Sequence, residues 1–434
     1  MKRSALLPIA LASFSFVSCN AGPHISKPPS GVTTRVFASQ SVSSPAAAAG
    51  LLIIDGAIDT LVRGGIATGT SPGLMAVAPD RATAIVFDSA TNQVDVVNAL
   101  KETVAGTIPL PGPTSSMVVP VIGTGYAAVP TAPLTGFPMG GVVVMNLAAG
   151  GITATLSVPN AQTVVANANG TQLLVFSNDS DAVTVISPLL LNTGNPVTVT
   201  APGFDRPVYG IFSGDGNTAY ILNCGAECGG TQASVQIIDL TTTPPSAGAR
   251  VPVNGATIGF VSGSTLYVAG NGTPTGPLCT SISSAAPTAA QYCGTLDLVN
   301  LATMTDPYYN NPATEIAVTD GYHDRIDMSV NGQLFIGSQG CTNIGNVDNP
   351  QGEVRGCLSI FNTTNSTVVI PPDNGDVTGL QSLTSRDVEY VAEGGNVRVY
   401  DTLIDSLIPN NQYITGGTIL TKGYIIDVKA VDFF

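Results

Sequence analysis

The residues best suited to chemistry stand together in the last third of the chain, in Tyr322-His323-Asp324-Arg325 and at Asp327. His323 has a carboxylate and a guanidinium close by. Such a histidine could bind an anionic or polar ligand, or act as a general base. The alternative is a network of hydrogen bonds that only stabilises the fold. With two histidines in all and no HExxH or haem-attachment motif, the sequence predicts no metal and no cofactor.

Cysteines supply a second kind of chemistry. Six of the seven fall into three close pairs: Cys224 with Cys228, Cys279 with Cys293, and Cys341 with Cys357. We predict a disulfide within each pair and therefore a compartment outside the cytoplasm. A thiolate metal site is the alternative, but the CxxC spacing and the histidine partners typical of such sites do not occur in the sequence.

The N-terminus is typical of a secretory signal peptide, with Lys2 and Arg3 ahead of an apolar run over residues 5–17. The run is too short to span a membrane comfortably. The four residues that end at Cys19, Phe-Val-Ser-Cys, resemble a bacterial lipobox, in which the cysteine is acylated and becomes the mature N-terminus. Ordinary cleavage near Ala21, which would discard Cys19, is the alternative.

This resemblance implies a division of the chain into three parts. Residues 1–19 would be the lipoprotein signal peptide, 20–31 a flexible tether rich in Pro, Ser and Gly, and 32–434 the folded domain. Asn20 is not the aspartate associated with retention at the inner membrane. The protein is therefore expected to be exported and lipid-anchored at the outer membrane, facing the periplasm or the cell surface, with the anchor as its only membrane attachment.

The composition limits both fold and partners. Charged residues make up 10% and apolar residues 44%, with 48 Gly, 31 Pro and no Trp. This mixture suits many short strands joined by tight turns. Without Lys2 and Arg3 the chain has 13 basic against 29 acidic residues, a formal charge of −16. Such a surface repels phosphate backbones, so nucleic acids are not expected as partners.

The strands that must position these residues follow a repeat. A five-residue alternating pattern that closes on Asp, Asn or Ser occurs eight times, ending at Asp55, Asn98, Asn146, Ser187, Asp239, Asn300, Asn362 and Asp401. A second strand precedes each pattern, a Thr/Val-rich strand follows, and a further short strand lies between units. Four strands per unit at this period predict the blade of a β-propeller.

The two chain ends complete one blade. Residues 424–434 would supply its inner strand and the N-terminal part of the domain its other three strands, so that pairing the ends closes the ring. Ile426, Val428 and Val431 are the apolar positions expected to be buried there. The sequence thus predicts an all-β fold, a single propeller of eight four-stranded blades, with seven as the alternative.

A known repeat resembles this pattern. The segment Ser71-Pro-Gly-Leu-Met-Ala-Val-Ala-Pro-Asp80, followed by AIVFDSATNQVDVVN, is similar to the YVTN-type β-propeller repeat. Such repeats occur in surface-layer, redox-enzyme and lactonase-like proteins, so the resemblance implies fold more than function.

The repeat also brings candidate residues together. In such blades, the loops from the second to the third strand and from the fourth strand to the next blade share one face. Three consecutive blades, those with the cysteine pairs, have long second-to-third loops, which suits recognition or only protection of the insertions. Ligand-binding candidates that converge at the channel on this face are Arg206, Tyr209, His323, Asp324, Arg325, Asp327 and Asp427, with Asp205 and Lys429 beside them.

These observations favour a non-enzymatic binding or scaffold propeller of the cell envelope, because catalytic groups are few. Its partner would be an envelope protein, a glycan or a small polar ligand, and the protein is expected to be a monomer. A lactonase-like or other hydrolytic propeller enzyme is the alternative, and a structural envelope component is a third possibility.

Overall fold

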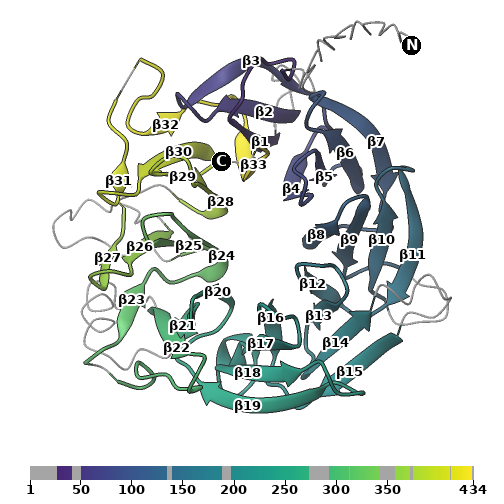
Figure 1. The fold of residues 1–434 in the computed structure, drawn as a ribbon, viewed down its shortest axis with the longest axis vertical. Helices are drawn as coiled ribbons and strands as arrows, with labels where there is room; N and C mark the ends of the chain where they lie inside the picture. Colours follow the sequence, from purple (N-terminus) through teal and green to yellow (C-terminus); the bar gives the residue numbers. More distant parts are fainter. Residues whose placement is uncertain are drawn as a thin grey trace, which may run out of the picture.

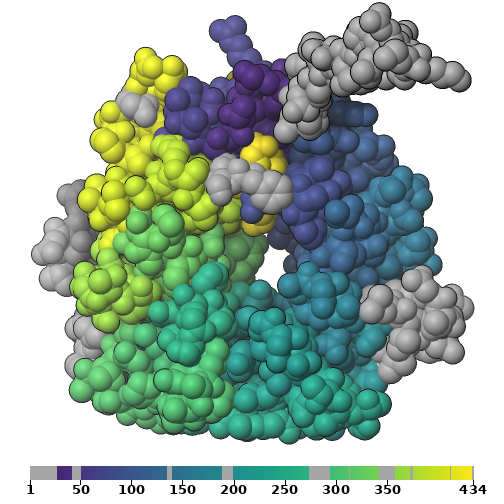
Figure 2. Space-filling view, in the orientation of Figure 1, coloured from purple at the N-terminus to yellow at the C-terminus, as the bar shows by residue number. Residues whose placement is uncertain are grey.

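The computed structural model describes residues 27–41, 50–133, 139–187, 197–272, 293–311, 313–341, 357–371, 375–410 and 412–432. Its strands form eight antiparallel sheets arranged in a ring (Figure 1). Figure 2 shows an opening at the centre of this ring. The fold is an eight-bladed β-propeller, and the alternative of seven blades is wrong.

The first half of the ring holds blades 1 to 4, whose strands are named from the innermost to the outermost. Blade 1 is β33 (Tyr424–Ala430), β1 (Arg35–Ser41), β2 (Gly50–Asp55) and β3 (Thr60–Ile66). Blade 2 is β4 (Pro72–Val77), β5 (Thr83–Asp88), β6 (Gln93–Asn98) and β7 (Thr103–Pro109). Blade 3 is β8 (Ser116–Val121), β9 (Thr124–Val129), β10 (Gly141–Asn146) and β11 (Gly151–Ser157). Blade 4 is β12 (Ala161–Ala166), β13 (Leu173–Ser177), β14 (Ala182–Ser187) and β15 (Val197–Pro202).

The second half holds blades 5 to 8. Blade 5 is β16 (Pro207–Phe212), β17 (Thr218–Asn223), β18 (Ser234–Asp239) and β19 (Ser246–Pro252), with the 3-10 helix η2 (Gly225–Cys228) after β17. Blade 6 is β20 (Ile258–Ser262), β21 (Thr265–Gly272), β22 (Cys293–Asn300) and β23 (Ile316–Val318). Blade 7 is β24 (Tyr322–Met328), β25 (Gln333–Gln339), β26 (Leu358–Asn362) and β27 (Thr367–Val369). Blade 8 is β28 (Val377–Leu383), β29 (Val388–Glu393), β30 (Asn396–Asp401) and β31 (Ser406–Leu407), and β32 (Thr418–Ile419) also pairs with β30.

Side-chain-capped turns end the third strand of seven blades, as the repeat predicts, and the turn after Ser187 in blade 4 lies outside the described residues. Asp55, Asn300 and Asp401 each accept a hydrogen bond of 2.9 Å from the backbone N–H two residues further on. Asp and Asn favour such turns because the short side chain replaces a backbone acceptor. The turn therefore has the same geometry in blades 1, 6 and 8.

The antiparallel order gives the ring two distinct faces. Turns from the first to the second strand and from the third to the fourth strand lie at one end of the blades, which we call the turn face. Loops from the second to the third strand, and from one blade to the next, lie at the other end, which we call the loop face. The long loop after β17, which contains η2, belongs to the loop face, and β21 and β25 end at this face, where β22 and β26 begin.

The chain ends meet in blade 1 and close the ring, as predicted. β33 pairs with β1 in antiparallel register, with Phe37 opposite Lys429 and Ala38 opposite Val428. Arg35, whose side chain is 2% exposed, binds Asp432 beyond β33 at 2.6 Å and Glu102 of the neighbouring blade at 3.1 Å. Strand pairing and a buried ion network therefore hold the two ends together.

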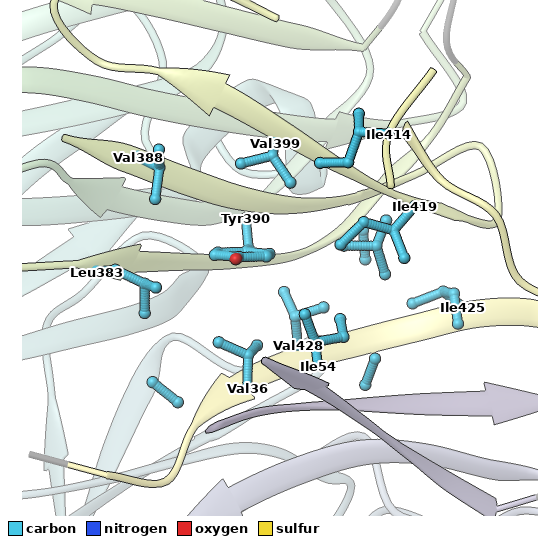
Figure 3. Packing of buried hydrophobic residues seen from close by; sticks show 14 of the residues in the cluster. Val36, Ile54, Leu383, Val388, Tyr390, Val399, Ile414, Ile419, Ile425 and Val428 are labelled. Atoms are coloured by element: carbon cyan, nitrogen blue, oxygen red, sulfur yellow. The ribbon is translucent and has the colours of Figure 1, made fainter. Parts of the chain in front are cut away.

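Eight clusters of buried apolar side chains fill the eight seams between neighbouring blades. Figure 3 shows the seam between blades 8 and 1, where Ile425 and Val428 of β33 pack near Tyr390. The expected burial of Val428 and Val431 is confirmed, but Ile426 is only partly buried and Ile425 takes its place. The reason is a register shift between Ser39 and Gln40, opposite Ile426, which moves Ile425 onto the face of Val428.

Helical structure contributes little to the described residues. None of the helices in these ranges has the length and apolar character needed to cross a bilayer. Residues 1–26, which carry the predicted signal peptide, Cys19 and most of the tether, lie outside the described residues. The last residues of the predicted tether do touch the propeller, because the Ser30 N–H and hydroxyl donate to Glu102 at 2.7 and 2.6 Å.

Candidate functional site

The inner strands of six blades share one irregularity, a β-bulge near the end that starts at the loop face. The extra residues are one of Gly73 and Leu74 in β4, Gln162 in β12, Val208 in β16, Asp324 in β24, Thr378 in β28 and Ile426 in β33. A bulge bends its strand and redirects the side chains beside it. Six blades therefore present one unpaired residue each at the same level of the ring.

His323 lies directly before the bulge of β24 and is completely buried. The residues at this position in the other bulged strands are apolar and also buried: Pro72, Ala161, Pro207, Val377 and Ile425. Its Nε2 donates to the Thr319 carbonyl at 2.7 Å, and Nδ1 has no hydrogen-bond partner. Burial lowers the pKa of His323 to about 4, against the opposing effect of that hydrogen bond. The imidazole is thus neutral and faces the protein interior, which does not fit the expected exposure at the channel.

Asp324 and Arg325 form a bound pair beside the bulge. The Arg325 Nη1 lies 3.0 Å from the Asp324 carboxylate, and its Nε donates to the Thr378 carbonyl at 2.6 Å. Gln339 donates to Asp324 at 2.6 Å. Burial raises the pKa of Tyr209, on β16, while the guanidinium of Arg325 lowers it. Asp324, Arg325 and Tyr209 are therefore brought into one electrostatic group, in which Nε and Nη1 of Arg325 already bind backbone carbonyls and a carboxylate.

Asp327 and Asp427 belong to a second group, which stabilises the seams. Asp427 is 3% exposed, accepts a hydrogen bond from the Met75 N–H at 3.0 Å and pairs with Lys429 at 3.1 Å. Asp327 accepts from the Ser382 N–H at 2.9 Å. Burial and then the nearby Asp327 raise the pKa of the fully buried Glu389 well above its usual range, while Lys429 lowers it. The sequence interpretation missed Glu389, because it occupies a strand position that is apolar in several other blades.

Two of the predicted residues line accessible cavities, Tyr209 a cavity of about 450 Å³ with the turn from Ser213 to Gly216, and Arg206 a cavity at the loop face that we call the mouth pocket. This mouth pocket, of about 260 Å³, lies between blades 4 and 5 at the loop face, and Tyr322 of blade 7 also lines it. Its polar lining consists of Gln162, Thr163, Ser177, Asn178, Asp179, Ser180, Arg206 and Tyr322, and Cys228 contributes as well. Tyr322 is 52% exposed. A concave site with a few convergent polar groups is the usual form of a small-molecule site.

The Arg206 guanidinium has only weak partners in this pocket. It lies 3.6 Å from Asp179 and 3.8 Å from Asp181, carboxylates that are 87% and 66% exposed. Exposed pairs of this length contribute little energy, so a ligand can compete for the guanidinium. The backbone of Arg206 has φ +56°, a left-handed conformation unusual for a residue with a side chain. The Arg206 N–H donates to Asp181 at 3.2 Å, and its carbonyl accepts from the Cys224 N–H at 2.9 Å, which holds this conformation.

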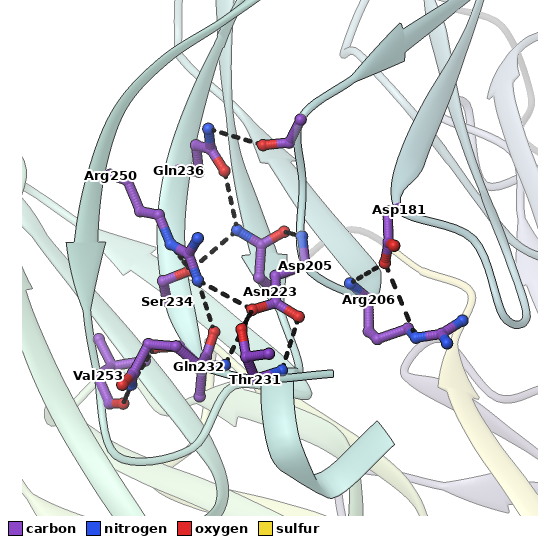
Figure 4. A network of polar contacts seen from close by, with 12 residues as sticks. Asp181, Asp205, Arg206, Asn223, Thr231, Gln232, Ser234, Gln236, Arg250 and Val253 are labelled. Atoms are coloured by element: carbon purple, nitrogen blue, oxygen red, sulfur yellow. Dashed lines mark hydrogen bonds and ion pairs between the residues drawn. The ribbon is translucent and has the colours of Figure 1, made fainter. Parts of the chain in front are cut away.

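Asp205 positions the loop that borders the pocket rather than a ligand (Figure 4). Its carboxylate accepts hydrogen bonds from the Thr231 and Gln232 N–H groups, both at 2.9 Å, and from Arg250 at 3.2 Å. Burial acts to raise the pKa of Asp205, but the hydrogen bonds from Thr231, Gln232 and Arg250 outweigh it and lower the pKa to about 2. Asp205 therefore remains charged and fixes the loop after β17.

Two of the three predicted disulfides are present, Cys224–Cys228 and Cys341–Cys357. The pairing of Cys279 with Cys293 lies outside the described residues. Further contacts connect the loops of blades 5 to 7: Glu227 accepts from the Asn271 N–H and side-chain amide, both at 2.9 Å, and Asn271 donates to the Gly321 carbonyl at 2.8 Å. The disulfides are consistent with an exported protein.

Sequence reasoning missed the blade 4 side of the pocket. Gln162, Asn178 and Asp179 are common loop residues with no motif of their own. Only the bulge at Gln162 distinguishes one of them, and alternation of polar and apolar residues does not reveal a bulge. Within the described residues, no three His, Cys, Asp or Glu side chains gather as a metal site would require.

Comparison with known proteins agrees with the architecture. No protein-family model matches the sequence, and no curated protein matches it.

Solved β-propeller structures are similar. Dihydro-heme d1 dehydrogenase NirN is 11% identical over 94% of this chain and 77% of its own, with a TM-score of 0.59. A protein from Lactobacillus plantarum is 10% identical over 92% of this chain and 99% of its own, with a TM-score of 0.50. The Pseudomonas aeruginosa periplasmic gluconolactonase PpgL is 12% identical over 92% of this chain and 98% of its own, with a TM-score of 0.48. At these identities the likeness shows the fold alone.

Proposed function

We propose that this protein is a lipid-anchored cell-envelope propeller that binds a small polar ligand, such as a glycan, in the mouth pocket. The observation that supports this proposal is the pocket itself. It combines the weakly paired guanidinium of Arg206 with the amides of Gln162 and Asn178 and the half-exposed ring of Tyr322. Hydroxyl-rich ligands need such mixed donors and acceptors, and an aromatic ring can stack on the apolar face of a sugar.

A binding role has more support than the hydrolytic alternative. His323, the only histidine in the described ranges, is buried and bound to a backbone carbonyl. A general base must come within hydrogen-bond reach of the group it deprotonates. The residues that line the pocket instead suit hydrogen bonding and stacking.

A glycan array followed by titration calorimetry tests the ligand class. We expect at least one array glycan to bind the purified protein, and Arg206→Ala to weaken that binding about 10- to 100-fold, the effect of a lost hydrogen bond to a charged group. Arg63→Ala removes an exposed arginine from β3 and is the matched control. No bound glycan, or equal affinity of the Arg206→Ala variant, would contradict the proposal.

The anchor has its own test. In the expressed full-length protein, Cys19→Ser should move the protein from the membrane fraction to the soluble fraction. Unchanged partitioning of this variant would show that the lipoprotein assignment is wrong, whatever the array finds.

A further inference from the structure

Large apolar side chains are exposed on the turn face, where short polar turns are usual. Six of them lie on turns of blades 7, 8, 1, 2 and 3, which are consecutive in the ring: Ile58, Leu100, Ile122, Val330, Leu403 and Ile404, each 45–66% exposed. We call this set the apolar turn patch. Five neighbouring blades thus present large apolar side chains on the same face, and apolar surface gathered on one face can mark an interaction site.

Among the described turn-face residues, blades 5 and 6 carry no large exposed apolar side chain, and the turn after β14 in blade 4 lies outside the described residues. In blade 6, Ala302 stands at the turn position that Leu403 occupies in blade 8. Each of the two residues donates its N–H, at 2.9 Å, to the side chain that closes the preceding strand. In blade 5 the corresponding turn is Leu-Thr-Thr-Thr from residue 240, with Thr241 to Thr243 exposed. The backbone geometry of the turn is therefore shared, while the described turns of blades 5 and 6 lack the exposed apolar side chains of the patch.

The N-terminal segment leaves the propeller inside this patch. Ser30 binds Glu102, which follows Leu100 in the same turn of blade 2, and Arg35 opens β1 at the turn face. Lys27, the first described residue, stands eight positions after Cys19. A fully extended chain of this length spans at most about 28 Å. A lipid on Cys19 would therefore keep the turn face close to the bilayer.

We propose that the apolar turn patch docks on the lipid bilayer, so that the loop face and its mouth pocket point away from the membrane. This inference rests on the proposed lipid anchor and adds a second, direct contact with the membrane. Carboxylates close several of these turns, among them Asp55 and Asp401, and the whole chain has a formal charge of −14. The preferred surface is therefore a zwitterionic one, because anionic lipids would repel the protein.

Single tryptophans can test this orientation, because the chain contains none. Leu403→Trp places a fluorophore on the patch, and Ala302→Trp places the same fluorophore at the same turn position outside it. The lipidated full-length variants are reconstituted on phosphatidylcholine vesicles with and without brominated chains. We expect a blue shift and strong quenching by brominated lipid for Leu403→Trp, and neither for Ala302→Trp.

Each other outcome counts against docking. Equal quenching of both variants would show attachment without a preferred orientation, and quenching of neither would show that the patch does not reach the bilayer. A dimer that shields Leu403→Trp from brominated lipid would assign the patch to a second copy of the chain. Ile58→Trp, on the matching turn of blade 1, repeats the test if Leu403→Trp does not fold. Failure of the anchor is recognised separately, because the protein would then not remain on the vesicles at all.

Discussion

Two parts of the ring are held together by different means. Blades 5 to 7, the disulfide sector, carry Cys224–Cys228 and Cys341–Cys357 in their loops. Blades 8, 1 and 2, the closure sector, hold the chain ends by strand pairing, apolar packing and the buried ion pairs of Arg35. The covalent links thus constrain loops outside the sheets, while the fold itself depends on non-covalent contacts at the closure.

Two buried carboxyl groups, one in each sector, show opposite pKa shifts. Asp205 in the disulfide sector accepts hydrogen bonds from Thr231, Gln232 and Arg250, and its pKa is lowered to about 2. Glu393 at the end of β29 is fully buried, accepts one hydrogen bond from the Tyr400 hydroxyl at 2.8 Å, and has no partner for Oε1. Asp205 thus holds the loop after β17 as a charged group, whereas Glu393 in the closure sector is most stable when neutral.

Removal of β33 should cause the largest loss of stability, because it breaks the closure of the ring. A chain that ends at Thr421 loses Ile425, Val428 and Val431 from the seams of blade 1. Each large buried side chain contributes about 1.5–3 kcal/mol, against a domain stability of about 5–15 kcal/mol. We expect the truncated chain to be insoluble or quickly digested in limited proteolysis, whereas a chain that begins at Lys27 should fold. Cooperative melting of the truncated chain at the full-length temperature would refute closure by β33.

Arg35→Met should cause the next largest decrease in the free energy of unfolding. The substitution leaves the carboxylates of Glu102 and Asp432, which are 6% and 18% exposed, without their cation. Loss of one partner from a buried ion pair costs about 3–5 kcal/mol. Denaturant unfolding should show this decrease in the free energy of unfolding, and the exposed Arg63→Met should change it by less than about 0.5 kcal/mol. Equal effects of the two substitutions would show that the ion network does not stabilise the closure.

The sequence predicted the ring well because its signals are local and repeated. Alternating five-residue patterns that close on Asp, Asn or Ser locate the third strand of every blade, and the complementary chain ends predict the split blade. Bulges leave no such signal, since one extra residue in an inner strand shifts the pattern without breaking it.

The site was less predictable, because it depends on bulges and on contacts between blades that leave no local signal in the sequence. Aligned by blade, His323 falls at a position filled elsewhere by Pro72, Ala161 or Val377, and this comparison would have predicted its burial. The mouth pocket unites residues of blades 4, 5 and 7, and a list of strands does not contain the distances between blades. Residue type identified Arg206, but only the structure shows which neighbours it has.

The stability contributed by Glu393 should depend on pH in the opposite sense to that contributed by Asp205. Burial raises the pKa of Glu393 to about 7, against the effects of Tyr400 and Arg398. The folded state therefore binds this proton more tightly than the unfolded state, whose pKa is near 4.5. The contribution of Glu393 is fully present below pH 4.5 and falls as the pH rises through 7, by about 3 kcal/mol at 1.36 kcal/mol per pKa unit.

Denaturant unfolding of the wild type and Glu393→Gln from pH 4 to 8 measures this contribution. Glutamine resembles the neutral acid and does not titrate, so the difference in stability between the two proteins should change in favour of the variant as the pH rises. Asp205 provides the contrast, because its stabilisation is present above pH 3.8 and is lost only as the pH falls towards 2. A difference between wild type and Glu393→Gln that stays constant with pH would show that Glu393 does not titrate in this range.

Removal of the short disulfide should have the smallest effect on global stability. Cys224 and Cys228 are four residues apart, and the loop-entropy relation gives about 2 kcal/mol for so short a loop. The Cys224→Ser, Cys228→Ser variant should lose no more than this, because Asp205 still binds Thr231 and Gln232. Asp205→Asn should lower the stability more in the variant without the disulfide than in the wild type. In that variant the carboxylate is the constraint that remains on the loop, so its removal has a larger effect. Differential scanning calorimetry of the four proteins gives this coupling, and strictly additive losses would show that the two constraints act independently.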